Sequence, residues 1–169
     1  MLINGSSDDV RLPAKIGAWL FALWGVLHVW VGAEGVRQYL TGGTSGLWNM
    51  LIGGSAVPRA GFVHATDPVT LFAQGQLILN FCMDVGGYGV LGFFVAWLIL
   101  KRASWIGYLL GLIVIGICDL TFLFAMVVSG VIELNAGTVG GPVLWFLAVV
   151  VTPFGLPTQR KAGWARHSM

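Results

Sequence analysis

Charged side chains are scarce in this sequence. Of its 169 residues only 9% are Asp, Glu, Lys or Arg, whereas 57% are hydrophobic, and the mean hydropathy is +0.85. Soluble domains carry about 25% charged residues, so the composition excludes an ordinary soluble globular protein. The formal net charge of +2 is small and dispersed, which argues against a nucleic-acid partner. The sequence therefore predicts an integral membrane protein with a single domain over residues 1–169.

Cysteine and histidine are also rare. Cys82 and Cys118 lie inside apolar segments with no CxxC or Cys/His ligand spacing, so we interpret them as small buried hydrophobic residues. Only His28 of the three histidines falls within an apolar segment, so one chain offers no second intramembrane histidine for haem. No nucleotide-binding, Ser/His/Asp or phosphate-loop pattern is present. We therefore expect neither a metal nor another cofactor.

Four apolar segments are long enough to cross a bilayer, whose core requires about 20 helical residues. They lie at about 16–39, 70–100, 104–134 and 139–157, with Asp67 before Pro68 as the start of the second helix. The pattern predicts an all-α, integral membrane four-helix bundle. Residues 40–69, rich in Gly, Ser, Thr and Pro, are predicted to form a long loop between the first two helices, with 47–52 as a re-entrant or interface-lying segment.

Lysine and arginine are unevenly divided among the connections. Only Arg37 and Arg59 fall on the side of the 40–69 loop. The others fall on the side of the two termini: Arg11, Lys15, Lys101, Arg102, Arg160, Lys161 and Arg166. Because cytoplasmic segments carry the excess of Lys and Arg, both termini are predicted to be cytoplasmic, in what we expect to be a bacterial inner membrane.

The second span carries polar residues in a regular pattern. Gln76, Asn80, Asp84 and Tyr88 recur every fourth residue, so on a helix they form one stripe along an apolar cylinder. An aspartate at the centre of a span costs about 2.5–3.5 kcal/mol on insertion scales, and an unpaired amide adds to that cost. We therefore expect the stripe to face a protein interior and not lipid.

Two further ionisable residues lie deep in the predicted spans, His28 in the first and Asp119 in the third. Together with Asp84 they form the candidate catalytic set. Burial disfavours the charged form of a carboxyl and a nearby imidazolium favours it, and such opposing environments hold a proton donor and a proton acceptor in one site. The candidate substrate-binding residues are polar neighbours of Asp84 and aromatic residues suited to shield a cationic intermediate: Asn80, Tyr88, Gln76, Trp24 and Phe122.

These residues favour a membrane-embedded enzyme that performs acid/base chemistry on a lipophilic, lipid-like or isoprenoid-like substrate in an intramembrane pocket. The reaction would be an isomerisation, a cyclisation or a hydration. Three other interpretations stay open: a non-catalytic lipid- or quinone-binding subunit of a larger membrane complex, a proton-coupled carrier, or hydrogen bonds that only fix helix packing. The expected partners are a lipophilic small molecule and membrane lipid, with a homo-oligomer or a larger membrane complex as the open forms of assembly.

Overall fold

The computed structural model of the protein describes residues 10–157. Within this range the chain forms helices and no strand, and four of the helical segments are long and apolar enough to cross a membrane. The prediction of an all-α protein with four such segments is confirmed. Arg160, Lys161 and Arg166, which contribute to the predicted orientation, lie outside the described residues.

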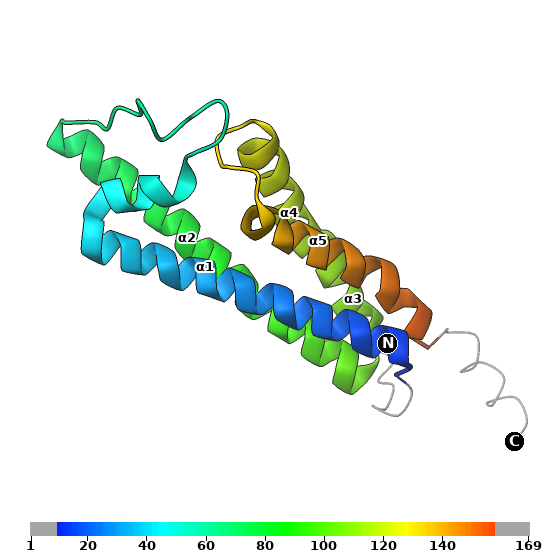
Figure 1. Ribbon diagram of the computed structural model, residues 1–169. Helices are drawn as coiled ribbons and strands as arrows, with labels where there is room; N and C mark the ends of the chain where they lie inside the picture. Colours follow the sequence, from blue (N-terminus) through cyan, green and yellow to red (C-terminus); the bar gives the residue numbers. More distant parts are fainter. Residues whose placement is uncertain (1–9, 158–169) are drawn as a thin grey trace, which may run out of the picture.

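The helices form two adjacent layers (Figure 1). Helices α1 (Leu12–Leu51) and α2 (Pro68–Arg102) run antiparallel as one pair. The third long helix consists of α3 (Trp105–Leu110), η2 (Gly111–Ile115), α4 (Gly116–Phe122) and η3 (Leu123–Val128), and the fourth of α5 (Ala136–Val151) and η4 (Thr152–Gly155). The backbone N–H of Arg11 donates to the carbonyl oxygen of Gly155 at 3.1 Å, so the two ends of the described chain meet at one end of the bundle.

Local capping sets where helices α2 and α5 begin. The Asp67 carboxylate accepts a hydrogen bond from the backbone N–H of Thr70 at 2.7 Å, and Pro68 occupies the first turn, as the sequence predicted. Hydrogen bonds from Thr70, through its side chain and its backbone, lower the pKa of Asp67. Helix α5 begins with a capping box between Asn135 and Thr138. These caps satisfy N–H groups that the helices themselves leave unpaired.

Helix α1 extends beyond the predicted span, and the connection to α2 is correspondingly shorter than expected. Residues 44–51, predicted as part of a loop, are helical and fold back at Gly43, which has φ 58° and ψ −148°. That left-handed φ is readily adopted only by glycine. Leu47 and Leu51, one turn apart, are buried in a cluster with Ile78 and other residues, which holds this segment against α2 (Figure 1). The irregular connection is therefore limited to residues 52–67.

Glycines bring the backbones of α1 and α2 into direct contact. A Cβ atom at Gly25 would lie 2.7 Å from the carbonyl oxygen of Gly89, and one at Gly32 would lie 2.8 Å from Cα of Gly86. Real Cβ atoms do not approach so closely, so this contact requires glycine on both helices. The close pairing turns the glycine face of α2 toward α1.

The hydrophobic core lies toward the end where Arg11 and Gly155 meet. Its largest fully buried side chains include Phe21, Trp24 and Ile99. Helix α2 packs there against α3 and η2 but has no comparable packing against α4. A second, smaller cluster around Leu47 and Ile132 lies at the opposite end. The space between the two clusters holds the candidate site.

Candidate functional site

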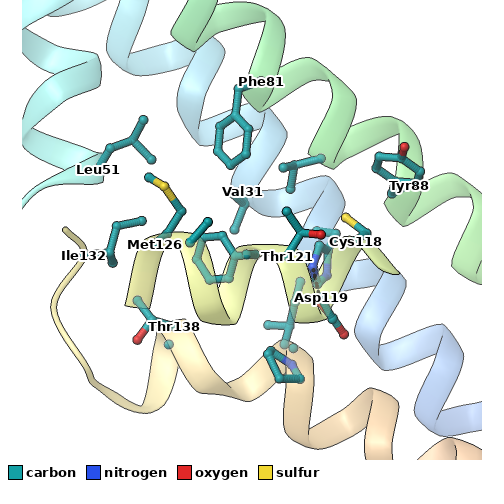
Figure 2. Close-up of a pocket in the computed structure, with 18 of the residues that line it drawn as sticks. Val31, Leu51, Phe81, Tyr88, Cys118, Asp119, Thr121, Met126, Ile132 and Thr138 are labelled. Carbon is teal, nitrogen blue, oxygen red and sulfur yellow. Dashed lines mark ion pairs between the residues drawn. The ribbon is translucent and has the colours of Figure 1, made fainter. Parts of the chain in front are cut away.

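A cavity of about 780 Å³ lies between the α1–α2 pair and the helices α4, η3 and α5. Figure 2 shows side chains from α2 and from α4 and η3 pointing toward this common space. Its lining is mostly apolar and includes Leu27, Val31, Leu51, Phe81, Val85, Tyr88, Ile117, Phe122, Met126 and Ile132. The volume falls within the range of about 300–1,000 Å³ that is typical of small-molecule sites.

The exposure of cavity-lining residues on α2 and α4 indicates that the cavity has a lateral opening between these helices. Tyr88 on α2 and Ile117 and Thr121 on α4 line the cavity and are also exposed at the surface of the chain. Tyr88 is 38% exposed and Ile117 is 64% exposed, and the helices that carry them are not closely packed at this level.

Asp119 and His28 form a polar centre in the cavity wall. Asp119 is 1% exposed, and its Oδ2 accepts a hydrogen bond from Trp24 Nε1 at 2.7 Å. Its other oxygen, Oδ1, lies 3.5 Å from His28 Nε2. Oδ1 is buried and has no hydrogen-bond partner among the described residues. One oxygen of the carboxyl group is thus fixed by the Trp24 indole, and the other is buried beside the imidazole without a hydrogen bond from the described residues.

The orientation of the His28 ring is fixed by its own helix. Its Nδ1 lies 2.8 Å from the backbone carbonyl oxygen of Trp24, and its ring stacks on the Trp24 indole with 3.7 Å between centroids. Because a carbonyl oxygen can only accept, Nδ1 carries the hydrogen of this bond. In the neutral imidazole Nε2 is then the acceptor, and it faces Asp119.

Helix α4, which carries Asp119, is flanked by the π-helical segments η2 and η3. A π-helical turn holds more residues than an α-helical turn, so the side chains that follow it are rotated around the helix axis. The carbonyl oxygen of Gly111, at the start of η2, accepts a hydrogen bond from Trp145 Nε1 at 3.0 Å. Such turns are frequent at functional sites, and here they border the segment that presents the buried carboxyl group.

Gly141 on α5 borders His28 and Asp119, although it was not among the predicted site residues. A Cβ atom there would lie 2.8 Å from His28 Cε1 and 3.5 Å from Asp119 Oδ1. At the neighbouring Gly140 a Cβ atom would meet only Leu27, at 3.8 Å. The backbone of α5 therefore packs directly against the imidazole. The only signal in the sequence was the glycine pair before Pro142 in a span without ionisable residues.

The structure brings several of the predicted site residues together. His28 and Asp119 are adjacent, and Tyr88 and Phe122 line the same cavity. Trp24, predicted to contact substrate, is fully buried behind the pair and holds Asp119 through its indole N–H. It is therefore a positioning residue.

The remaining predicted residues lie elsewhere, on the outer face of α2. Asp84 and Asn80 are exposed, and Asn80 Nδ2 donates to Asp84 Oδ2 at 2.9 Å. Gln76 is also exposed and donates to the Tyr39 hydroxyl at 2.9 Å. The expectation that this stripe faces an interior is not met within one chain, because the glycine face of α2 packs against α1. Asp84 is accordingly separate from the polar centre formed by His28 and Asp119.

Glu34 also lines the cavity, away from its apolar portion. Its carboxylate accepts hydrogen bonds from Arg37 Nε at 2.7 Å and from Arg37 Nη2 at 2.6 Å. A third bond, from Gln38, also measures 2.7 Å. Both oxygens of Glu34 thus accept from protein donors, whereas Oδ1 of Asp119 does not. Within residues 10–157 no three His, Cys, Asp or Glu side chains are grouped as a metal site requires.

Comparisons of the chain with protein-family models, with curated proteins and with solved structures gave no match. The cavity and its polar centre are therefore the features of the molecule that indicate a function.

Proposed function

We propose that this protein binds a lipophilic small molecule in the cavity and rearranges it by proton transfer, with His28 and Asp119 as the catalytic residues. The observation that supports this most is the buried, unpartnered Oδ1 of Asp119, next to His28 Nε2 in the wall of an apolar cavity. An unsatisfied buried acceptor costs about 1–3 kcal/mol. A ligand group that donates a hydrogen bond to Oδ1, or a proton held between Oδ1 and His28 Nε2, would offset that cost.

In the resting state of the proposed site, Asp119 Oδ1 and His28 Nε2 share one proton. When the proton is on Asp119 Oδ1, His28 Nε2 is free to accept another, so the pair holds a donor and an acceptor 3.5 Å apart. Asp119 would protonate one carbon of an unsaturated ligand while His28 removes a proton from a carbon nearby. The proton taken by Nε2 then returns to Oδ1, which restores the starting state.

Because the pair gives the ligand one proton and takes one from it, the proposed chemistry favours an isomerisation or a cyclisation over a hydration. Neither of the first two reactions consumes a co-reactant, whereas hydration also requires a water molecule in an apolar cavity. The cavity lining supports a lipid-like or isoprenoid-like ligand, and the rings of Tyr88 and Phe122 offer faces that stabilise positive charge on such a ligand. The sideways opening between α2 and α4 supports entry from the membrane.

The proposal includes an orientation in the membrane, with both ends of the described chain on the cytoplasmic side. Arg11 and Lys15 at the start of α1 and Lys101 and Arg102 at the end of α2 support it, because these charges border the spans that their helices form. Arg37 and Arg59 belong to the opposite, outer side.

Native mass spectrometry of protein extracted gently from its own membranes tests the binding. We expect a retained lipophilic compound, lost when Ala125→Trp fills the cavity and kept in Val143→Trp, a matched change on the exposed face of α5. Retention that Ala125→Trp leaves unchanged would contradict binding in this cavity.

Incubating the purified protein with the compound identified in this way tests the chemistry. We expect conversion by the wild type and none by Asp119→Asn or His28→Ala. Full conversion by both variants would overturn the assignment of the catalytic pair. Binding without conversion by the wild type would instead identify a non-catalytic lipid- or quinone-binding subunit.

A further inference from the structure

The outer face of α2 carries polar groups near its middle, whereas the exposed face of α5 is apolar. Asn80 and Asp84 lie near the middle of this 35-residue helix and are both exposed. The exposed side chains of α5, by contrast, are large and apolar, namely Val143, Phe146, Leu147 and Val150. The face of α2 centred on Asn80 is therefore chemically distinct from the face that α5 presents.

The hydrogen bond within the chain satisfies these two groups only in part. Asn80 Nδ2 donates one hydrogen to Asp84 Oδ2 at 2.9 Å. The amide of Asn80 keeps a second N–H and a carbonyl oxygen, and the carboxyl group of Asp84 keeps its other oxygen. In the hydrocarbon region no water is present to pair with them, so ionisable and amide side chains there face another protein segment.

We propose that a second copy of this chain covers this face, with α2 packed against α2 in a parallel, twofold-symmetric dimer. In this arrangement Asn80 of each chain donates its second N–H to Asp84 of the other chain. The face is self-complementary because it carries both a donor and an acceptor. A twofold axis along the bundle also places identical residues of the two chains at the same depth. The polar groups of one chain therefore lie level with those of the other.

The backbone geometry of α2 permits the close approach that such a dimer needs. Gly87 lies two turns after Asn80 on the same face, and a Cβ atom there would meet nothing within 4 Å. Ala73, seven residues before Asn80, is also exposed. Small residues at this spacing allow two membrane helices to pack closely, and the seven-residue period corresponds to a left-handed crossing of about 20°.

This inference is independent of the proposed function. Asp84 and Asn80 do not line the cavity, and the hydrogen bond between Trp24 and Asp119 lies within one chain. Tyr88, one turn beyond Asp84, does line the cavity. The second chain would therefore lie beside the sideways opening without supplying a group to the polar centre.

Measuring the dimer fraction in lipid bilayers over a range of protein-to-lipid ratios tests the inference, for example by single-molecule photobleaching. We expect Asp84→Leu to weaken association at least about tenfold, since the dimer loses two symmetry-related hydrogen bonds. Asp84→Asn retains hydrogen-bonding groups and should stay largely dimeric, and Phe146→Leu on α5 serves as the control. The leucine variant is more apolar than the wild type, so its insertion is not impaired.

Cysteine cross-linking tests the geometry of the same dimer. Gly87→Cys should form a disulfide between chains under mild oxidation, whereas Val143→Cys should not. The wild type is the background control, because Cys82 is buried and Cys118 is largely enclosed. A chain that stays monomeric at every ratio, an Asp84→Leu variant that associates as the wild type does, or cross-linking through Val143→Cys alone would overturn the proposal. A different protein that co-purifies in stoichiometric amount and blocks the Gly87→Cys cross-link would also overturn it.

Discussion

Two hydrogen-bonded pairs, Trp24 with Asp119 and Asn80 with Asp84, lie within helices of this protein. Their surroundings are opposite. Asp119 is 1% exposed and is held by Trp24, a residue 95 positions away in the chain. Asp84 is exposed, and among residues 10–157 its side chain bonds only to that of Asn80, four residues away on the same helix. The first pair therefore depends on how helices pack, and the second does not. An aspartate in the middle of a long apolar helix can therefore be buried or exposed, according to which helix supplies its partner.

The largest difference between the two pairs is expected on removing each carboxyl group. Asp119→Ala leaves the buried Trp24 N–H without its acceptor and should lower the free energy of unfolding by about 3 kcal/mol. Asp84→Ala removes a bond between exposed groups and should change the stability of the single chain by less than about 0.5 kcal/mol. Denaturant titration in mild detergent at high dilution measures both. Equal losses would mean that the two aspartates do not differ as described.

A second contrast uses neighbouring glycines on α5. Gly141→Ala places a methyl group 2.8 Å from His28 Cε1, so the imidazole must move away from Asp119. We expect a loss of about 1–3 kcal/mol from overpacking, together with at least roughly tenfold slower conversion of the bound compound. Gly140→Ala, whose methyl group would lie 3.8 Å from Leu27, is the matched control and should behave as the wild type. Normal conversion by Gly141→Ala would contradict the role given to His28.

A third, smaller effect is expected from removing the indole N–H alone. Trp24→Phe keeps an aromatic ring under His28 but takes away the donor to Asp119 Oδ2. The expected loss is about 1–2 kcal/mol, with slower conversion because the carboxyl group is less well fixed. Trp19→Phe is the control, since Trp19 is 63% exposed and does not line the cavity. Thermal unfolding and initial rates of the two variants give the comparison, and identical behaviour would argue against a positioning role for Trp24.

The smallest effect is expected at Asp67, a third carboxyl group, which lies at the start of α2 and has local donors only. Asp67→Ala removes the cap of α2 and should lower the midpoint of thermal unfolding slightly, with no change in conversion. Because the pKa of Asp67 is lowered in the folded chain, its contribution is complete above the ordinary aspartate pKa of 3.8. The contribution is lost as the pH falls through the lowered value. A difference from the wild type that is the same at pH 7 and at pH 2 would contradict this cap.

Much of the fold could be predicted from apolar length and capping residues, as the start of α2 at Pro68 shows. The helical segment after Gly43 could not, because glycine and serine usually mark loops and here they allow a sharp fold and close packing. The four-residue period of the α2 stripe correctly placed Asn80 and Asp84 on one face. Which side that face takes depends on the contact between α1 and α2, a tertiary property that a periodic pattern does not contain.

For His28 and Asp119, the sequence predicts two polar residues at a similar depth in their spans. It does not predict that they are in contact. Their contact depends on the rotation of α4 between its flanking π-helical segments and on the close approach of α5 at Gly141. Both features arise from packing between helices, so they have no local signature in the sequence.

The most direct test of proton transfer in the cavity is deuterium incorporation from D2O into the compound that the protein retains. The account predicts that the wild type and Asp84→Asn place deuterium on a carbon of the recovered compound, and that Asp119→Asn and His28→Ala do not. Incorporation that persists in Asp119→Asn and His28→Ala, or that is lost in Asp84→Asn alone, would contradict the account. So would a wild-type protein that leaves the retained compound undeuterated.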